Sequence, residues 1–330
     1  MVNITGIVDE IARLDALRAL DMLDTPPEAE FDAIAAGARH LFGCKFAFVS
    51  LVDADRQWFK AACGLEASET PRDVSFCTHT IAADDLLVIA DTRKDLRFAT
   101  NPMVVETPFV RFYAGVPLRV TPPGGGAALP IGTLCVADDK PQDPTREKLE
   151  ILAGMARVVE ALLEARRTSK ENLQLALDRA REGAPLAIAI IDLNRFKEVN
   201  DRLGHATGDK VLQVMAAKLQ AVQYLGDHFI GRLGGDEFVL ILRGRRTQEE
   251  LVQDIARLLA DLRYAVPDDC SVITVSATIG ACVYGASYVD RASLLKEADE
   301  ALYRAKRMQR GTAAIAGNSA HIQSLVGEPR

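Results

Sequence analysis

Apolar and polar positions in the first half of the chain alternate in a pattern that predicts an antiparallel sheet. The apolar run 46–52, the polar turn 53–55 and a second run over 57–62 are typical of a β-hairpin. A second hairpin is predicted from residues 112–118 and 131–136, which flank a loop rich in Pro and Gly. The other elements expected in this half are a helix over 28–41 and a short strand over 86–90. Together these elements predict an α+β module.

A stretch without proline follows over 145–167, and helix-forming residues continue to 181. Apolar residues recur in it at alternating steps of three and four, as in a heptad seam: Leu149, Leu152, Ala156, Val159 and Leu163. Two interpretations are open. The seam lies between two predicted domains, where a dimerising helix would be placed. Alternatively, the helix is amphipathic and packs on its own sheet.

The second half alternates strands and helices. An apolar strand over 185–191 ends in Asp192, and two apolar runs around Gly234-Gly235 predict a hairpin whose turn needs positive φ. Helices are predicted from 207, over 249–262 and over 293–307, with a strand over 272–279. We therefore expect a sheet with helices on its faces, followed by a short polar tail that is frayed.

A length of 330 residues predicts two domains. The elements above place a first domain over 20–165, a helical linker over 145–181, a second domain over 182–312 and a tail over 313–330.

The charge balance narrows the possible partners. Lys and Arg number 39 and Asp and Glu 46, so the formal net charge is −7, which argues against nucleic acid or a membrane surface as a partner. No apolar run approaches the length that spans a bilayer, and the charged residues in 1–20 do not form a signal peptide. The six cysteines contain no CxxC pair, which favours reduced thiols in a cytoplasmic protein.

Two acidic positions are candidates for chemistry because of where they lie. Asp192 ends an apolar strand, and Asp236 follows the Gly-Gly turn with Glu237 beside it. If the two elements are neighbours in one sheet, the carboxylates converge at one edge, where they would hold Mg²⁺ or Mn²⁺ and assist phosphoryl chemistry. The alternative is that these are ordinary solvated carboxylates at turns.

Four motifs in order give these positions a context. Residues 232–238, Arg-Leu-Gly-Gly-Asp-Glu-Phe, resemble the signature hairpin of diguanylate cyclases, the GGDEF family. Residues 192–209 resemble the upstream motif of that family, residues 275–280 its following strand and residues 298–311 its closing helix. The resemblance implies a fold like the palm of nucleotidyl cyclases, with a central, mostly antiparallel sheet. It also implies an enzyme that converts two GTP molecules into cyclic di-GMP and pyrophosphate.

The resemblance also assigns roles to individual residues. It implies that Asp192, Asp236 and the backbone carbonyl of Leu193 bind the metal, that Asp236 is the general base for the 3′-hydroxyl and that Glu237 assists the metal site. Asn200 and Asp209 would recognise guanine, since a carboxylate accepts from its N1–H and N2–H₂; the alternative for Asp209 is a carboxylate in the first turn of a helix. The remaining substrate-binding residues implied are Phe196 and Lys197 in a phosphate-holding loop, His205, and Lys306 and Arg310, one helical turn apart, for the β- and γ-phosphates.

The chain departs from the family at two places. The usual opening turn, Asp-x-Leu-Thr-Gly-Leu-x-Asn-Arg, is replaced by residues 167–175. The inhibitory product site, Arg-x-x-Asp, is replaced by Leu225-Gly-Asp-His228, so no product-inhibition site is expected.

The first half resembles a GAF domain over about residues 25–163, on the motifs 75–79, 98–102, 112–118 and 132–136. The resemblance leaves the GAF ligand unknown. Cys77 and His79 suggest a metal or bilin, but two ligands do not make a closed zinc site, and Thr78 separates the pair. A packed core or another small ligand is the alternative.

The two resemblances imply a GAF-like antiparallel sheet with helices, joined by a long helix to the palm-like domain. The expected function is a GAF-regulated diguanylate cyclase that acts as a homodimer through its linker helix and GAF domain, because each subunit would hold one GTP. Two alternatives are a catalytically inactive module that binds GTP or a partner, and a cyclase with another purine preference.

Overall fold

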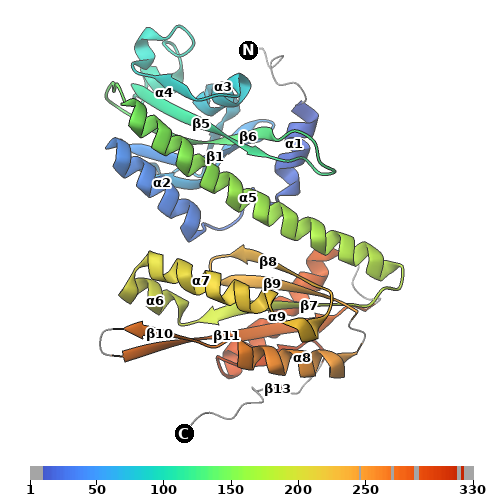
Figure 1. Ribbon diagram of the computed structural model, residues 1–330. Helices are drawn as coiled ribbons and strands as arrows, with labels where there is room; N and C mark the ends of the chain where they lie inside the picture. Colours follow the sequence, from blue (N-terminus) through green and yellow to red (C-terminus); the bar gives the residue numbers. More distant parts are fainter. Residues whose placement is uncertain (1–9, 245–246, 269–270, 286–289, 318–320, 323–330) are drawn as a thin grey trace. The chain divides into compact units, whose positions relative to one another are not determined.

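The computed structural model describes residues 10–244, 247–268, 271–285, 290–317 and 321–322 (Figure 1). The chain divides into two compact units, residues 1–167 and 168–330, and each is described by itself.

The first unit contains a six-stranded antiparallel sheet in the order β3-β2-β1-β6-β5-β4. Both predicted hairpins are confirmed, because β1 pairs with β2 and β5 with β6. The strands are β1 (Phe46–Val52), β2 (Arg56–Cys63), β3 (Glu69–Pro71), β4 (Leu87–Ile89), β5 (Phe112–Val120) and β6 (Leu129–Asp138).

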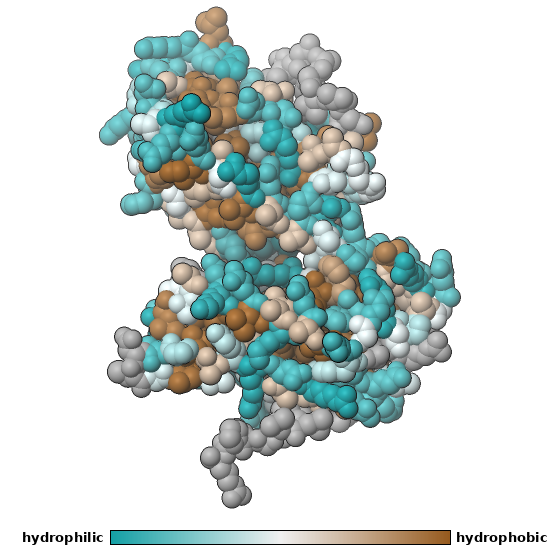
Figure 2. Space-filling view, viewed as in Figure 1, coloured by the Kyte–Doolittle hydropathy of each residue, from teal (hydrophilic) through white to brown (hydrophobic). Residues whose placement is uncertain are grey.

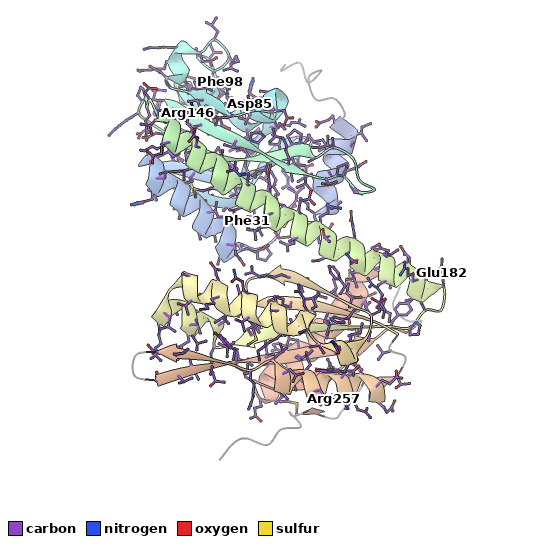
Figure 3. All side chains as sticks on the ribbon, in the orientation of Figure 1. Phe31, Asp85, Phe98, Arg146, Glu182 and Arg257 are labelled. Atoms are coloured by element: carbon purple, nitrogen blue, oxygen red, sulfur yellow. The ribbon has the colours of Figure 1, made fainter. Side chains whose placement is uncertain are left out.

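Helices cover both faces of this sheet, so each strand buries both of its alternating sides. One hydrophobic core contains Phe31, and the core on the other face contains Phe98; both residues are labelled in Figure 3. The helices are α1 (Glu10–Ala19), α2 (Ala29–Phe42), α3 (Phe76–Ala83) and α4 (Pro102–Val105), with 3₁₀ turns at Arg72–Val74 and Thr92–Lys94.

The long helix α5 (Arg146–Arg181) is continuous over 36 residues, and Arg146 and Glu182 mark its two ends in Figure 3. Leu152, Ala156, Val159 and Leu163 are fully buried in the core of the first unit. The interpretation of these residues as a dimer seam is therefore wrong, because their own sheet covers them. The heptad spacing could not identify the surface that the apolar face packs against.

The second unit contains a sheet in the order β13-β12-β11-β7-β9-β8, with β10 paired to β11. All pairs are antiparallel except β11 with β12, which confirms the mostly antiparallel sheet. The strands are β7 (Leu186–Asn194), β8 (His228–Gly234), β9 (Glu237–Arg243), β10 (Tyr264–Asp268), β11 (Ser271–Val283), β12 (Ala313–Ile315) and β13 (His321–Ile322).

Part of the segment predicted to be a frayed tail belongs to this sheet. Ala313 and Ile315 are fully buried and Ala314 nearly so, and the three residues pair with β11. The expectation of fraying was wrong for these residues, because three apolar residues are too few to stand out from a polar segment.

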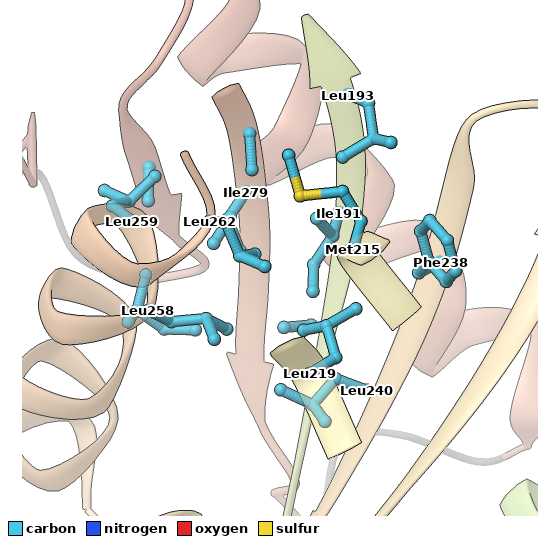
Figure 4. Packing of buried hydrophobic residues seen from close by; sticks show 14 of the residues in the cluster. Ile191, Leu193, Met215, Leu219, Phe238, Leu240, Leu258, Leu259, Leu262 and Ile279 are labelled. Carbon is cyan, nitrogen blue, oxygen red and sulfur yellow. The ribbon is translucent and has the colours of Figure 1, made fainter. Parts of the chain in front are cut away.

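Helices lie on both faces of the second sheet as well. Odd-numbered residues of β7, such as Ile191 and Leu193, belong to one core cluster with Met215 and Leu258 (Figure 4). Even-numbered residues pack against the last helix of the unit and the end of α5. The helices are α6 (Phe196–Leu203), α7 (His205–Gln220), α8 (Gln248–Asp261) and α9 (Arg291–Met308), with a 3₁₀ turn at Gln223–Leu225.

The surface facing the viewer in Figure 2 is mainly hydrophilic, with apolar patches between. Within the ranges given above, no helix is both long and apolar enough to cross a membrane.

Candidate active site

Asp192 continues an apolar series on one face of β7. Side chains two apart share a face of a strand, and Leu186, Ile188 and Ile190 pack on the α9 side. Asp192 is the next member of that series and is 7% exposed. The alternation of β7 thus directs a carboxylate toward α9 at the point where the hydrophobic core ends.

The Gly-Gly hairpin brings the other two carboxylates to the same place. Strand β9 pairs with β7 so that Glu237 lies opposite Asp192, and the Leu193 N–H donates to the Asp236 carbonyl at 3.2 Å. The turn between β8 and β9 is closed by Gly235, with φ of +52°, whose carbonyl accepts from the Arg232 guanidinium at 2.6 and 2.9 Å. The two acidic elements are therefore neighbours in one sheet, which is the condition for the predicted convergence of their carboxylates.

Helix α9 supplies a cation to this edge. A side chain at Gly280 of β11 would collide with the backbone of Ala298 and Leu302, so the glycine lets α9 lie directly on the strand. This close packing places Lys306 beside β7, where its Nζ lies 2.7 Å from Asp192 Oδ2. The sequence had suggested Lys306 as a phosphate ligand, whereas in this structure it pairs with a carboxylate.

Burial raises the pKa of the Glu237 carboxyl. The Lys306 ammonium lowers this pKa, whereas the charges of Asp192 and Asp236 raise it further, and the net shift is upward. A divalent cation among the three carboxylates would relieve this repulsion.

The donor set fits a hard cation, because carboxylate oxygens on two neighbouring strands are what Mg²⁺ prefers. Among the described side chains, no group of three or more His, Cys, Asp and Glu is already arranged to hold a metal ion. The predicted ligands Asp192, Leu193, Asp236 and Glu237 lie together but are not preassembled as such a group. Their role as ligands therefore stays a prediction.

Of the two residues predicted to recognise guanine, Asn200 lies on α6 and Asp209 on α7, two helices that pack together. A side chain at Gly208 would collide with the Asn200 amide and come within 3.4 Å of the Phe196 ring, so Asn200 lies against the residue next to Asp209. Helix α7 begins at His205, so Asp209 lies beyond its first turn, and the interpretation of Asp209 as a first-turn carboxylate is wrong. The Asp209 side chain is exposed. The side chain of His205 lies outside the described part, and its contact with substrate stays a prediction.

Two further predictions about local structure need correction. Phe196 and Lys197 do not lie in a loop but begin α6, after Arg195 with φ of +65°. Their backbone N–H groups are still candidates for phosphate, because the first N–H groups of a helix have no intrahelical acceptor. Helix α9 ends at Met308 and Gln309 is extended, so Arg310 is not on the helical face of Lys306.

Sequence reasoning missed a buried polar network that holds the segment after α9. Thr278 Oγ1 donates to Asn194 Oδ1 at 2.9 Å and accepts from the Gly311 N–H at 3.0 Å. Asn194 is two residues after Asp192, on the same face of β7. The network fixes exposed Arg310, the neighbour of Gly311, near the end of β7. The only signal in the sequence was a polar residue two positions after Asp192.

The residues at the position of the family's product site make contacts within the domain in this chain. Leu225 is fully buried, and His228 Nδ1 lies 2.8 Å from the Gly226 carbonyl. Asp227 pairs with Arg243 at 2.9 Å. These contacts agree with the expected lack of a product-inhibition site, which stays a prediction.

In the first unit, the side chains of Cys77 and His79 have different neighbours. The His79 ring packs edge-on against Phe98, with ring centroids 4.6 Å apart, and burial lowers its pKa. Cys77 is buried beside Cys135. This packing favours the core interpretation over a shared metal.

The second unit thus has an acidic hairpin beside Asp192 of β7, on a mostly antiparallel sheet covered by helices. Residues 161–312 match the model of the diguanylate cyclase GGDEF domain, and residues 26–163 match that of the GAF domain. The chain therefore consists of a GAF domain followed by a GGDEF domain of the diguanylate cyclase family.

Three known proteins or structures are similar to parts of this chain. The cyclic di-GMP phosphodiesterase PA2567 of Pseudomonas aeruginosa is 30% identical over 288 residues, 82% of this chain and 47% of that protein. Diguanylate cyclase TpbB of the same species is 36% identical over 140 residues, 42% of this chain and 32% of that protein. The crystal structure of the TpbB GGDEF domain is 36% identical, covers 45% of this chain and 93% of that domain, and gives a TM-score of 0.41. The chain spans less than half the length of these curated relatives.

Proposed function

We propose that this protein is a diguanylate cyclase that condenses two GTP molecules into one cyclic di-GMP and two pyrophosphates. The observation that supports the proposal is the pairing of Asp192 with Glu237 across β7 and β9, next to Asp236, with Lys306 Nζ 2.7 Å from Asp192 Oδ2. An acidic cluster with an adjacent cation suits a metal nucleotide, whose charge both groups would neutralise.

Each residue has a task that follows from its position. Asp192, Asp236 and the Leu193 carbonyl would hold Mg²⁺ or Mn²⁺, with Glu237 in support. When bound, the ion neutralises charge on the triphosphate as pyrophosphate leaves. Asp236, on the turn, would accept the proton of the 3′-hydroxyl as that oxygen attacks the α-phosphorus of the other GTP.

The remaining residues would seat the nucleotide. Asn200 and Asp209 would recognise guanine, and the N–H groups of Phe196 and Lys197 would hold phosphate at the start of α6. Lys306 would leave Asp192 to join Arg310 at the β- and γ-phosphates once metal and nucleotide arrive. Rate acceleration would then come mainly from positioning and charge neutralisation.

One subunit would supply one GTP, so the reaction needs a second copy. Because the inner seam of α5 is buried, we assign pairing to its outer face. Ile151, Val158 and Leu175 are 43, 53 and 48% exposed there. These three residues, together with the small exposed residues Ala161 and Thr168, follow a heptad spacing along the helix, with steps of seven, three, seven and seven residues. A straight helix drifts about 20° per heptad from this frame, and a left-handed supercoil of two copies would remove the drift.

Regulation of the cyclase would come from the GAF domain.

Because Leu225 and His228 replace the anchors of the product site, we expect cyclic di-GMP to compete with GTP at the active site and not to inhibit otherwise.

A second candidate function is a non-cyclising module that binds GTP. It is favoured by the continuous α5, which replaces the family's opening turn, and by the relative PA2567, named as a phosphodiesterase, which matches 82% of this chain. Retention of Asp192 and Asp236 favours the cyclase.

The test is incubation of the full chain with GTP and Mg²⁺, with cyclic di-GMP measured by chromatography. Asp236→Asn should abolish product. Asp227→Asn is the matched control, because Asp227 precedes β8 at the opposite end of the same hairpin, and it should retain activity. GTP binding without product in the wild type would establish the second candidate.

A further inference from the structure

A buried polar cluster in the GAF domain is not used by the proposed cyclase reaction. Cys77, on α3, and Cys135, on β6, have their sulfur atoms 3.6 Å apart, and their residues are 2% and 1% exposed. The two sulfur atoms are in van der Waals contact, and a disulfide would bring them to about 2.05 Å.

Hydroxyl groups surround Cys77 in particular. Thr133 Oγ1 donates to its sulfur at 3.0 Å and Tyr113 Oη at 3.5 Å. Behind these donors, Ser50 Oγ lies 3.0 Å from Thr133 Oγ1 and Thr80 Oγ1 lies 2.8 Å from Tyr113 Oη. A neutral thiol is a weak acceptor and a thiolate is a strong one, so this arrangement favours the thiolate of Cys77.

The electrostatic effect has the same direction. Burial raises the pKa of the Cys77 thiol, but hydrogen bonds from Cys135, Ser50, Thr133 and Tyr113 outweigh burial, and the net pKa is lowered. The pKa of Cys135 is raised, first by its hydrogen bond to Cys77 and then by burial. The two shifts have opposite directions, so Cys77 is the thiol of the pair that loses its proton more readily.

A small cavity is lined by both cysteines. Its volume is about 50 Å³, and Cys77, Cys135 and Tyr113 line it together with apolar residues such as Phe76 and Met103. That volume admits a few water-sized atoms. It suits a molecule such as hydrogen peroxide and is far too small for a bilin or a nucleotide. A metal would need more ligands than two thiols, and the described residues contain no such group.

We propose that Cys77 and Cys135 are a peroxide-reactive thiol pair that closes to an intramolecular disulfide within the GAF domain. Cys77 attacks one peroxide oxygen; the S–O bond forms, the O–O bond breaks, and the leaving hydroxide takes a proton to become water. The Cys135 sulfur then attacks Cys77, the S–S bond forms, and the second oxygen leaves with the Cys135 proton as water. Two thiols lose two electrons in total, and one peroxide becomes two waters. This inference does not depend on cyclase activity.

The test uses the full chain. The protein is exposed to hydrogen peroxide, its remaining thiols are alkylated after denaturation, and peptides are mapped by mass spectrometry. The result expected is a cross-linked peptide pair containing Cys77 and Cys135, which forms at least about tenfold faster than any oxidation of Cys63. Cys63 is the internal comparison, because it is more exposed and burial raises its pKa.

Two variants separate the steps. Cys135→Ser should leave Cys77 as a sulfenic acid that dimedone traps, and Tyr113→Phe should slow the oxidation several-fold while keeping the ring. The proposal is overturned if Cys77 and Cys135 stay fully alkylated while Cys63 is oxidised. Cross-links that join Cys77 or Cys135 only to other cysteines would also overturn it.

Discussion

Lys306 Nζ lies 2.7 Å from Asp192 Oδ2, and this pair joins the last helix of the GGDEF domain to the end of its central strand. The Asp192 side chain is 10% exposed and that of Lys306 29%. Lys306 therefore neutralises, in this structure, the carboxylate that we assign to the metal. The pair links the stability of the domain to the chemistry proposed for it.

Lys306→Gln should affect both properties. Removing the ammonium leaves a buried carboxylate without its charged partner, which should lower the free energy of unfolding by about 1–3 kcal/mol in urea titrations. The same change should lower kcat/KM for GTP by about 10²-fold, because a phosphate-neutralising cation is lost. Lys296→Gln, an exposed position on the same helix, should change neither quantity. Unchanged turnover by the Lys306 variant would refute the assigned role.

Gly208→Ala should disturb guanine recognition through Asn200. The added methyl group overlaps the Asn200 amide, which must shift from its position. We expect KM for GTP to rise about tenfold, as for loss of one hydrogen bond, with a smaller change in kcat. The double variant with Asn200→Ala should be no worse than Asn200→Ala alone, because the clash is then absent. Additive effects of the two changes would contradict this explanation.

Because of Glu237, the free energy of unfolding should decrease as the pH rises. The pKa of its carboxyl is raised in the folded state, so the protein binds this proton more tightly when folded. The resulting stabilisation is complete below the ordinary pKa of about 4.5 and is lost as pH rises through the higher folded-state value. Glu237→Gln resembles the protonated form. Its melting temperature in metal-free buffer should exceed that of the wild type by about 2–4 °C at pH 7 and match it at low pH.

The control for this comparison is Glu147→Gln, an exposed glutamate in the first turn of α5, which should follow the wild type at every pH. A wild-type advantage at pH 7 without metal would show that Glu237 is stabilised as the anion.

Val158→Glu should separate the two subunits. A charge at this 53% exposed position of the outer face of α5 would be buried between two copies. Light scattering should then give a monomer at micromolar concentration, and cyclic di-GMP formation should fall at least about tenfold, because each subunit holds half of the site. Leu96→Glu introduces the same charge at a 96% exposed leucine elsewhere and should leave both properties unchanged. An active monomeric Val158 variant would rule out pairing through this face.

Short apolar runs and the turn residues between them predicted the strands of both sheets. The strand over 46–52, both GAF hairpins and the Gly-Gly hairpin follow from such runs and from turn chemistry, which act over a few residues. The neighbouring positions of Asp192 and Asp236 also followed, because the strand and the hairpin are adjacent in one sheet. The prediction that this strand ends at Asp192 was wrong, because β7 continues to Asn194.

The features that the sequence missed depend on contacts between distant segments. The seam at Leu152 and Val159 has the same spacing whether a sheet or a second helix covers it. Helix α9 ends before Arg310, and Gly311 instead bonds to Thr278, a contact between segments 33 positions apart. No local pattern carries such information, and the same applies to the contact between Cys77 and Cys135, 58 positions apart.

Cyclic di-GMP formation from GTP and Mg²⁺, measured over a range of protein concentrations, tests the central claim most directly. Our account predicts product in the wild type, a specific activity that rises with protein concentration, and no product with Asp236→Asn while its fold is retained. Bound GTP that is never converted, at any concentration of the wild-type protein, would contradict it.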